Sequence, residues 1–362
     1  MRISLRSGLA LFAVTVAVQA FAEPTIHQIA KFRLELIPSQ LQDPSRAFHF
    51  IASNPAGSGA KADDAFNGTT FSFLKSSTNN VAVAVSYGDS IATAFNYQAK
   101  PETPLFAYSV TKFVTGFLVA DQICSAKLNY SNTMGELSPS LRDTGYKNIT
   151  LVDVLNMSSG VYKDAQKFTV KSYQEVTMKG VTMLEQLKRR PTPDIKSNPK
   201  WDYSNFDSNA LAFALEDTTG SSIGDLFYEK IWSQIDSEFD GFWLKDSADR
   251  GVGAFGLALS ASDFVKVGKF LSSRINNDPC LNEHYSGEGI VIEGDRHRLS
   301  NWNKHSWKNP NNIKQFGGMG YGGQILVLDL DTKAVAFIYS HHMDGYNKDV
   351  WKLAWSLLDE SN

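Results

Sequence analysis

Apolar residues alternate with small or polar ones near the beginning of the chain and again near its end. Residues 81–97 alternate and reverse direction at a Gly-Asp pair, which predicts a β-hairpin. Residues 324–330 and 333–340 are two apolar runs separated by an Asp-Thr pair, and they predict a second hairpin. Residues 350–358 follow with helical spacing and predict a C-terminal amphipathic helix.

Between these β-rich ends the apolar positions recur with a helical period. The segments that predict helices are 109–126, 151–157, 181–188, 205–216, 223–235 and 262–271. The polar stretches 53–67 and 276–289, rich in Gly, Pro and Asn, predict exposed loops. The pattern therefore predicts an α/β plus all-α fold, with a central antiparallel sheet from both termini, flanking helices and an inserted helical subdomain.

The first 22 residues have the pattern of a secretory signal peptide. Arg2 and Arg6 precede an apolar run at residues 9–18, and residues 20–22 (Ala-Phe-Ala) form a small-residue cleavage site. The alternative is an uncleaved anchor, but the run is shorter than the roughly 20 residues that span a bilayer. We therefore expect an exported protein, periplasmic or secreted, with no membrane segment after cleavage.

The composition narrows the classes of partner. With 43% hydrophobic residues and a formal net charge of −3, the chain has the content of a globular protein and no basic stripe for nucleic acid. Its seven histidines are dispersed and no metal-binding spacing occurs, so we expect no metal and no other cofactor. A small-molecule substrate remains as the expected partner, and the oligomeric state stays open.

The two cysteines, Cys124 and Cys280, lie far apart in the sequence. In an exported protein they can form a disulfide, but the apolar surroundings of Cys124 equally fit a buried free thiol. Both alternatives stay open at this point. Four N-x-[S/T] matches, which leave glycosylation open, begin at Asn67, Asn129, Asn148 and Asn156.

The first candidate for chemistry is a serine three residues before a lysine, Ser109 and Lys112. On a helix this spacing puts both side chains on one face. A serine hydroxyl needs a base to act as a nucleophile, and a lysine in a partly apolar site loses its proton more easily. The Ser109 backbone N–H would lie in the first helical turn, where it can bind an oxyanion. The same spacing also fits an ordinary amphipathic helix.

Two further segments carry candidate groups. In Tyr-Ser-Asn at residues 203–205, Tyr203 is a candidate acid/base, and Asn205 a candidate to orient the substrate or Lys112. Typical loop and N-cap chemistry is the alternative. In the glycine-rich segment 317–324, an edge strand beside the nucleophile could donate a second backbone N–H, from Tyr321, to an oxyanion. A glycine-rich turn entering a sheet edge is the alternative.

In chain order these three segments resemble the motifs of the serine β-lactamase/penicillin-recognising superfamily. The match is to its class C-like branch of esterases, D-aminopeptidases and 6-aminohexanoate-dimer hydrolases. Segments 148–161, 217–220 and 253–264 also resemble family segments, and the similarity runs from about residue 81 to the end. The resemblance implies a β-lactamase/DD-peptidase-like fold. Its α/β subdomain would comprise residues 23–108 and 250–362, and its helical subdomain residues 109–249, with the active site in the cleft between them.

The resemblance also implies an amidase or esterase that forms an acyl-enzyme on Ser109. Lys112 and Tyr203 would move its proton, and which of the two is the working base stays open. The backbone N–H groups of Ser109 and Tyr321 would hold the oxyanion. The residues implied in substrate binding are Asn205, Gly320 and Tyr162, the last of which is equally well a rim aromatic.

The third motif departs from the family pattern. The family usually begins this triplet with Lys or His, whereas here it is Gly318-Met319-Gly320. The cation that would bind a β-lactam or peptide carboxylate is therefore missing at that position, unless Arg250, Arg296 or Arg298 replaces it. Ester or linear-amide hydrolysis is the favoured function. The alternatives are a β-lactamase or D-alanyl peptidase, and a catalytically silent binding or sensor protein.

Overall fold

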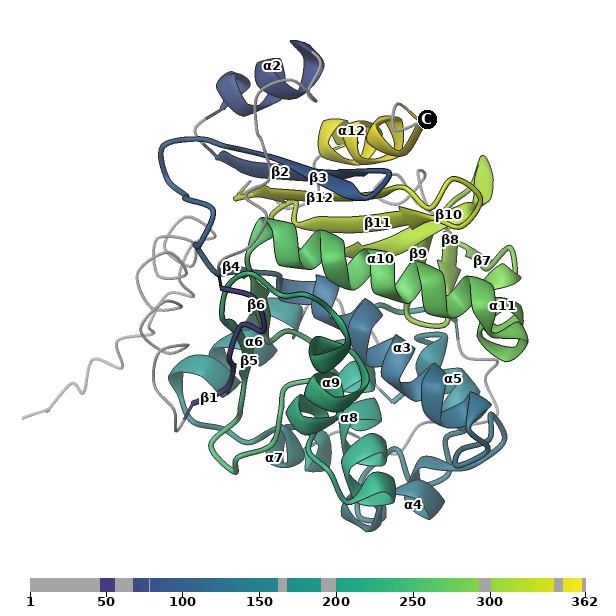
Figure 1. The fold of residues 1–362 in the computed structure, drawn as a ribbon. Helices are drawn as coiled ribbons and strands as arrows, with labels where there is room; N and C mark the ends of the chain where they lie inside the picture. The colour runs from purple at the N-terminus through teal and green to yellow at the C-terminus, as the bar shows by residue number, and fades with distance from the viewer. Residues whose placement is uncertain are drawn as a thin grey trace, which may run out of the picture.

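The computed structural model describes residues 46–55, 68–77, 79–161, 168–189, 200–292, 301–341 and 348–359. The predicted signal peptide, Tyr162, Arg296 and Arg298 lie outside the described residues. The largest feature is an eight-stranded antiparallel sheet with the order β3-β2-β12-β11-β10-β9-β8-β7 (Figure 1). Its strands are β2 Asn80–Tyr87, β3 Ser90–Phe95, β7 Ile290–Val291, β8 Asn301–Asn303, β9 Ser306–Asn309, β10 Asn312–Met319, β11 Ile325–Asp329 and β12 Val335–Ser340.

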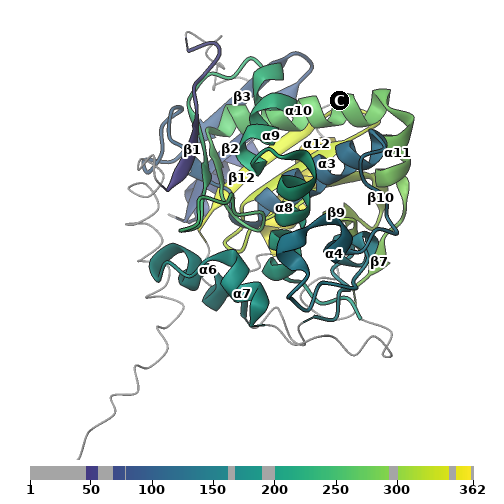
Figure 2. The same cartoon turned by 90° about the horizontal axis from the view of Figure 1, so that it is seen from below.

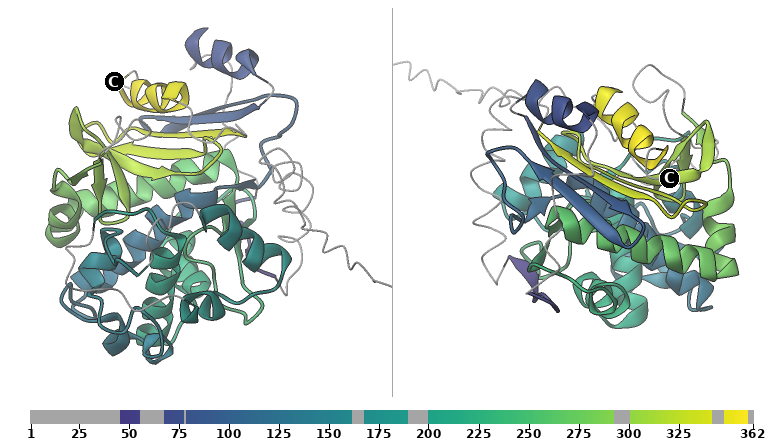
Figure 3. Two further views of the ribbon diagram at one scale, coloured as in Figure 1. Left: turned by 180° about the vertical axis from the view of Figure 1, so that it is seen from behind. Right: turned by 45° about the horizontal axis from the view of Figure 1, so that its top comes forward.

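Both predicted hairpins are confirmed, as β2–β3 and β11–β12. Strand β12 pairs with β2, with Phe337 opposite Ala84, so the two ends of the chain build one sheet as expected. The long helix α10 (Ala261–Asn277) packs on one face of the sheet. Helices α2 (Gly68–Ser76) and α12 (Lys348–Asp359) lie on the other face (Figure 3).

The central strands are buried on both faces because helices cover both. In β2, Ala82 and Ala84 belong to the core on the α10 side, whereas Val83 and Val85 belong to the core on the α12 side. On the α10 side the rings of Phe264 and Phe337 stack at 4.3 Å. This two-sided burial explains why these strands are almost continuously apolar in sequence.

The helical part of the fold lies below α10 in Figure 1 and faces the viewer in Figure 2. Its helices are α3 Thr111–Cys124, α4 Met134–Leu137, α5 Leu151–Leu155, α6 Thr169–Met178, α7 Met183–Lys188, α8 Asn205–Thr219 and α9 Ile223–Lys230, with 3-10 turns η1 Tyr108–Val110, η2 Pro139–Leu141 and η4 Trp232–Gln234. The sequence predicted helices at α3, α5, α7, α8, α9 and α10, but not at α4 or α6. Among the described residues, no helix combines the length and apolarity that a membrane crossing requires.

A second, four-stranded sheet was not predicted. Its order is β1-β5-β6-β4, formed by Ala47–Phe50, Gly241–Leu244, Leu257–Leu259 and Leu105–Phe106. These strands are two to four residues long, too short for alternation to stand out in the sequence. The division of the chain at residues 108/109 and 249/250 stays a prediction, and this sheet draws strands from all three ranges.

The prediction of an exposed loop at 276–289 is wrong for most of that segment, because it contains helix α11 (Pro279–Ser286). Asp278 caps the helix by accepting hydrogen bonds from two backbone N–H groups, and Pro279 occupies the first turn. Leu281 and Tyr285 are fully buried. The Asp-Pro pair that signals the start of a helix is present in the sequence, but the polar composition of the segment favoured the prediction of a loop.

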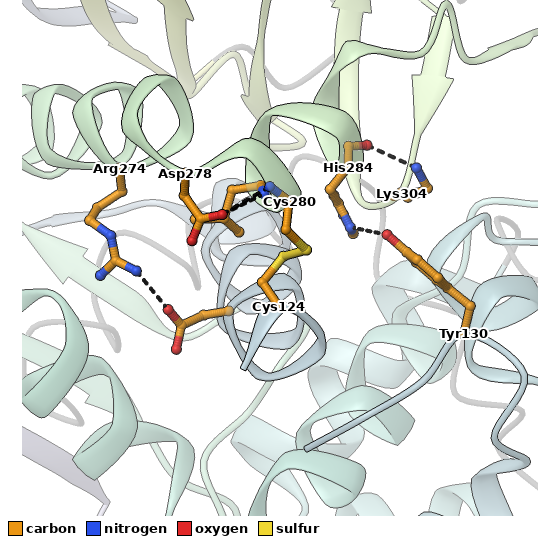
Figure 4. The surroundings of a disulfide bond; sticks show 9 residues. Cys124, Tyr130, Arg274, Asp278, Cys280, His284 and Lys304 are labelled. Carbon is orange, nitrogen blue, oxygen red and sulfur yellow. Dashed lines mark hydrogen bonds and ion pairs between the residues drawn. A yellow bond between two sulfur atoms is a disulfide. The ribbon is translucent and has the colours of Figure 1, made fainter. Parts of the chain in front are cut away.

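Helix α11 is tied to helix α3 by a disulfide between Cys124 and Cys280, with a Cα–Cα distance of 5.6 Å (Figure 4). Of the two alternatives left open by the sequence, the structure therefore has the disulfide. An ion pair between Arg274 and Asp121 at 3.1 Å lies beside it. The two cysteines are 156 residues apart in the sequence, and a disulfide that closes so long a loop typically stabilises the folded state by about 2–5 kcal/mol. This disulfide joins the end of α3 to the α/β part of the fold.

Candidate active site

Ser109 lies in the 3-10 turn η1, between strand β4 and helix α3, and is 9% exposed. The preceding residue, Tyr108, has a φ of +46°, which is uncommon for a residue with a side chain. The Tyr108 ring is buried and packs edge-on against Phe106 at 4.8 Å. This packing holds the backbone turn that presents Ser109 at the beginning of α3.

Lys112 is fully buried, and its Nζ makes three hydrogen bonds. It lies 2.9 Å from Ser109 Oγ, 2.7 Å from Asn205 Oδ1 and 2.8 Å from the Ala254 carbonyl oxygen. Among the described residues it has no ion-pair partner within 4 Å. Burial lowers the pKa of the Lys112 amine well below its ordinary value.

The partners of Lys112 determine how a neutral amine would be oriented. The amide oxygen of Asn205 and the carbonyl of Ala254 can only accept hydrogen bonds. A neutral amine would donate its two N–H groups to these oxygens and direct its lone pair at the Ser109 hydroxyl. The same three contacts also satisfy an ammonium group, so the site accommodates both protonation states.

Tyr203 contacts the same serine. Its hydroxyl is close enough to the Ser109 side chain for hydrogen bonding to lower the pKa of the phenol, and Lys112 Nζ lies 5.0 Å from the centre of its ring. Burial raises the pKa of Tyr203, and the bond to Ser109 lowers it by less. The phenol is therefore protonated at neutral pH and can pass a proton but does not readily give one up.

Helix α8 brings Asn205 to Lys112. Ser204 is its N-cap and accepts hydrogen bonds from the backbone N–H groups of Phe206 and Asp207, so the capping expected from the sequence is present. Asn205 is the first helical residue, and its Nδ2 donates to the Thr169 carbonyl at 3.2 Å. That bond leaves Oδ1 directed at Lys112.

The carbonyl of Ala254 was not anticipated from the sequence. Its loop is held by α3 and α8, because Thr115 donates to the Gly253 carbonyl at 2.9 Å and Asn209 accepts from the Ala254 N–H at 3.1 Å. Thr111 accepts from two further backbone N–H groups of this loop. A backbone acceptor has no side-chain signature, so sequence could not identify it.

Strand β10 passes directly beside the nucleophile segment. A Cβ on Gly318 would lie 2.9 Å from Phe113 Cβ and 3.0 Å from Val110 Cα, and one on Gly320 would lie 2.8 Å from the Ala107 carbonyl oxygen. Both glycines therefore allow an approach that a side chain would prevent. Tyr321 is the next residue, and the role of its backbone N–H stays a prediction.

The prediction of an edge strand at this place is wrong, because β10 lies between β9 and β11 in the sheet. Its pairing with β9 ends at Gly317, opposite Trp307, while Gly318 and Met319 pair with β11. The last residues of β10 consequently have a sheet neighbour on one side and the nucleophile segment close by. The short β9 has this effect without making β10 an edge strand.

An aromatic cluster holds Tyr203 in place and was also missed by sequence analysis. The Tyr203 ring lies 5.7 Å from both Trp302 and Trp307, and 6.2 Å from Trp201. Because these residues come from a loop and two strands, the sequence contained no periodic signal that would group them. Their rings restrict the phenol to an orientation that reaches Ser109.

A buried carboxylate lies one turn behind Tyr203. Asp207 Oδ1 accepts hydrogen bonds from Tyr146 at 2.6 Å and from Ser159 at 2.8 Å, while Oδ2 is buried and has no hydrogen-bond partner among the described residues. Burial raises the pKa of Asp207 to about 7, against the lowering effect of its hydrogen bonds. Asp207 thereby ties the loop at Ser159 to the beginning of α8.

Arg250 does not replace the missing cation. It pairs with Glu216 and Asp217, each at 3.2 Å, near the C-terminal end of α8, whereas Asn205 begins that helix. The other two candidate arginines lie outside the described residues. Within the described part of the chain, no cluster of three or more His, Cys, Asp or Glu side chains is arranged to hold a metal ion.

Comparison with known proteins identifies the class of protein. The Beta-lactamase family matches residues 66–358, and the chain belongs to that family. This confirms the resemblance and the fold expected from it. No curated protein matches the chain at a significant level.

Solved structures share the fold at low sequence identity. A protein provisionally assigned as a 6-aminohexanoate-dimer hydrolase from Bacillus anthracis has a TM-score of 0.70 and 18% identity, covering 86% of this chain and 89% of its own. A D-stereospecific amidohydrolase from Streptomyces has a TM-score of 0.62 and 15% identity, with coverages of 80% and 98%. A family VIII carboxylesterase has a TM-score of 0.60 and 13% identity, with coverages of 81% and 95%.

The Asp207 carboxyl generates a prediction about pH. Because its pKa is raised from 3.8 to about 7 in the folded state, its protonated form favours folding. This contribution is complete below about pH 4 and is lost as the pH rises to about 7. Asp207→Asn keeps the shape but does not titrate. Denaturant unfolding should show the stability of the wild type, relative to the variant, falling between these pH values.

His284 and His305, whose pKa values are lowered to about 3, are present in both proteins, so their contributions to the pH dependence cancel in the comparison. A difference between wild type and variant that is constant with pH, or that grows in favour of the wild type as pH rises, would contradict the raised pKa of Asp207.

Proposed function

We propose that the protein is a serine hydrolase that cleaves a carboxylic ester or amide through an acyl-enzyme on Ser109. The observation that carries the proposal is the buried Lys112 amine, 2.9 Å from Ser109 Oγ and otherwise bonded to two oxygens that can only accept. Such a pair is what nucleophilic catalysis by serine requires. Family membership supports the same class of chemistry.

In this proposal neutral Lys112 is the base for acylation. Its lone pair takes the Ser109 proton while Ser109 Oγ bonds to the substrate carbonyl carbon. Tyr203, whose pKa is raised by burial, stays protonated until it donates its proton to the leaving group, and the Lys112 ammonium then restores the phenol by passing on the proton that it took from Ser109. Water then cleaves the acyl-enzyme by the reverse transfers and regenerates Ser109.

The developing oxyanion would be bound by the backbone N–H groups of Ser109 and Tyr321. Loss of one such donor typically costs about 3 kcal/mol of transition-state stabilisation. The close approach of Gly320 to the Ala107 carbonyl supports this assignment, since it brings the end of β10 to the nucleophile turn. Asn205, Gly320 and Tyr162 remain the proposed contacts for substrate.

We further propose neutral esters and linear amides as the substrate class. The close packing of Gly318 on Val110 and Phe113 supports this, because no side chain, and hence no Lys or His, fits there without movement of the strand. Names of the fold relatives, which include an amidohydrolase and a carboxylesterase, are consistent with it. Export through the predicted signal peptide is part of the same proposal, and the disulfide supports it.

The nucleophile is tested by covalent labelling. A fluorophosphonate probe should label the wild type at Ser109, and Ser109→Ala should abolish labelling. Ser125→Ala is the control, because this exposed serine follows the same helix and should not affect labelling. Labelling that persists in Ser109→Ala would refute the assignment. A wild type that is never labelled would favour the silent binding or sensor protein.

The base is tested by the pH dependence of acylation. In the wild type the rate should rise with pH as Lys112 loses its proton. Tyr203→Phe should keep that rise at a rate about 10- to 100-fold lower, whereas Lys112→Ala should lose both rate and pH dependence, by about 10²–10⁴-fold. The opposite pattern, with the rise lost in Tyr203→Phe and kept in Lys112→Ala, would make Tyr203 the base.

The substrate class is tested with a panel of p-nitrophenyl esters, linear 6-aminohexanoate dimer, D-alanyl peptides and nitrocefin. A missing charge-assisted hydrogen bond costs about 1.5–3 kcal/mol. Nitrocefin and D-alanyl peptides, which carry a carboxylate near the scissile carbonyl, should therefore have kcat/KM values roughly 10- to 150-fold lower than with a cation at the position of Gly318. Short-chain esters should be hydrolysed, with weak or no turnover of nitrocefin. Efficient nitrocefin hydrolysis without esterase activity would support the β-lactamase alternative instead.

A further inference from the structure

The hairpin that connects β8 to β9 has an unusual tip. Asn303 pairs with Ser306, so only Lys304 and His305 form the turn. Both have positive φ values, +43° and +67°. A two-residue hairpin turn with positive φ at both positions ordinarily uses Asn and Gly, because residues with larger side chains rarely adopt such angles. A histidine kept there implies that contacts of its side chain hold the conformation.

His305 has such contacts: hydrogen bonds join it to the helical part of the fold, and its ring lies 5.6 Å from that of Trp302 in its own hairpin. Its backbone N–H donates to the Leu155 carbonyl at 3.0 Å, and Nδ1 lies 2.8 Å from the same oxygen. Because that oxygen only accepts, Nδ1 carries the proton, and Nε2 accepts from the Ser208 hydroxyl at 2.9 Å. The residue is 1% exposed, so both ring nitrogens are satisfied within the protein.

The position of His305 relative to the active site follows from helical spacing. A Cβ on Gly116 would lie 2.6 Å from His305 Cβ, so the glycine in α3 makes room for the histidine. Gly116 is four residues after Lys112 on α3, and Ser208 is three residues after Asn205 on α8, so each pair shares a helix face. His305 therefore fills the space between α3 and α8 one turn behind the Lys112–Asn205 hydrogen bond.

We propose that His305 is a positioning residue, which sets the separation of α3 and α8 and thereby holds Lys112 Nζ at hydrogen-bonding distance from Asn205 and Ser109. This inference rests on the proposed function for its catalytic consequence. The spacer comes from the α/β part of the chain and lies between two helices of the helical part. The position of the α/β part relative to the helical part therefore affects the distances from Lys112 Nζ to Asn205 and Ser109.

The test is a pair of complementary substitutions in the full chain. Gly116→Ala adds a methyl group against His305, and His305→Gly removes the opposing Cβ at a φ that glycine adopts freely. Each single variant should lower the acylation rate and kcat by about tenfold or more with little change in KM, because displacements of this size misplace catalytic groups. The double variant should recover about tenfold over Gly116→Ala, since the added methyl then has space.

Gly268→Ala is the matched control. Its Cβ would lie 2.5 Å from Val335 Cγ1, a similar clash between α10 and β12, with no contact to the active site. Gly268→Ala should lower the melting temperature. Its kcat, calculated per folded molecule with the folded fraction measured by circular dichroism, should equal that of the wild type. In Gly116→Ala, alanine favours the helix more than glycine, so helix propensity cannot account for a loss.

The titration of the Lys112 amine, followed by nitrogen NMR, measures the same spacing without turnover. The midpoint of this titration should shift in Gly116→Ala and return toward the wild-type value in the double variant. A single variant with wild-type acylation and an unchanged Lys112 titration, or a double variant no better than the worse single variant, would overturn the inference. A wild type that is not labelled at Ser109 would instead refute the proposed function, and the titration alone would then decide the role of His305.

Discussion

The buried amine of Lys112 is the constraint on which the arrangement of the active site depends. A lysine without a carboxylate partner is costly to bury when charged, and here burial lowers the pKa of its amine. Its contacts with Ser109, Asn205 and Ala254 satisfy the amine in either protonation state. The site can therefore exchange a proton at Ser109 without leaving a buried polar group unsatisfied, provided that all three partners stay in place.

Each partner comes from a different part of the fold, so the packing of these parts controls the chemistry. Ser109 is on the turn before α3, Asn205 is at the start of α8, and Ala254 is in a loop that both helices hold. Gly318 in strand β10 and Gly320 just after the strand come this close to the turn of Ser109 only because they lack a side chain. The same close approach leaves no space for a side chain at Gly318, and this crowding is the basis of the proposed substrate class.

Two connections between the α/β part and the helical part lie along α3. The disulfide of Cys124 joins the end of this helix to α11 (Figure 4), and the hairpin at His305 packs against its middle at Gly116. Their common effect is to restrict movement of α3 relative to the sheet. Lys112 on α3 and Ser109 on the turn before it, the proposed base and nucleophile, would benefit from such restraint, because small displacements of reacting groups have large effects on rate.

The sequence by itself determined the local features: both hairpins, the capped helix α8, and the serine and lysine on one helix face. These follow from periodicities and caps that involve neighbouring residues only. The tertiary structure alone decided the disulfide, the short second sheet, helix α11 against its polar composition, and the meeting of Lys112 with Ala254 and of His305 with Gly116. Contacts between residues more than a hundred positions apart depend on packing, and a backbone carbonyl or an opposing glycine leaves no pattern in the sequence that would announce its partner.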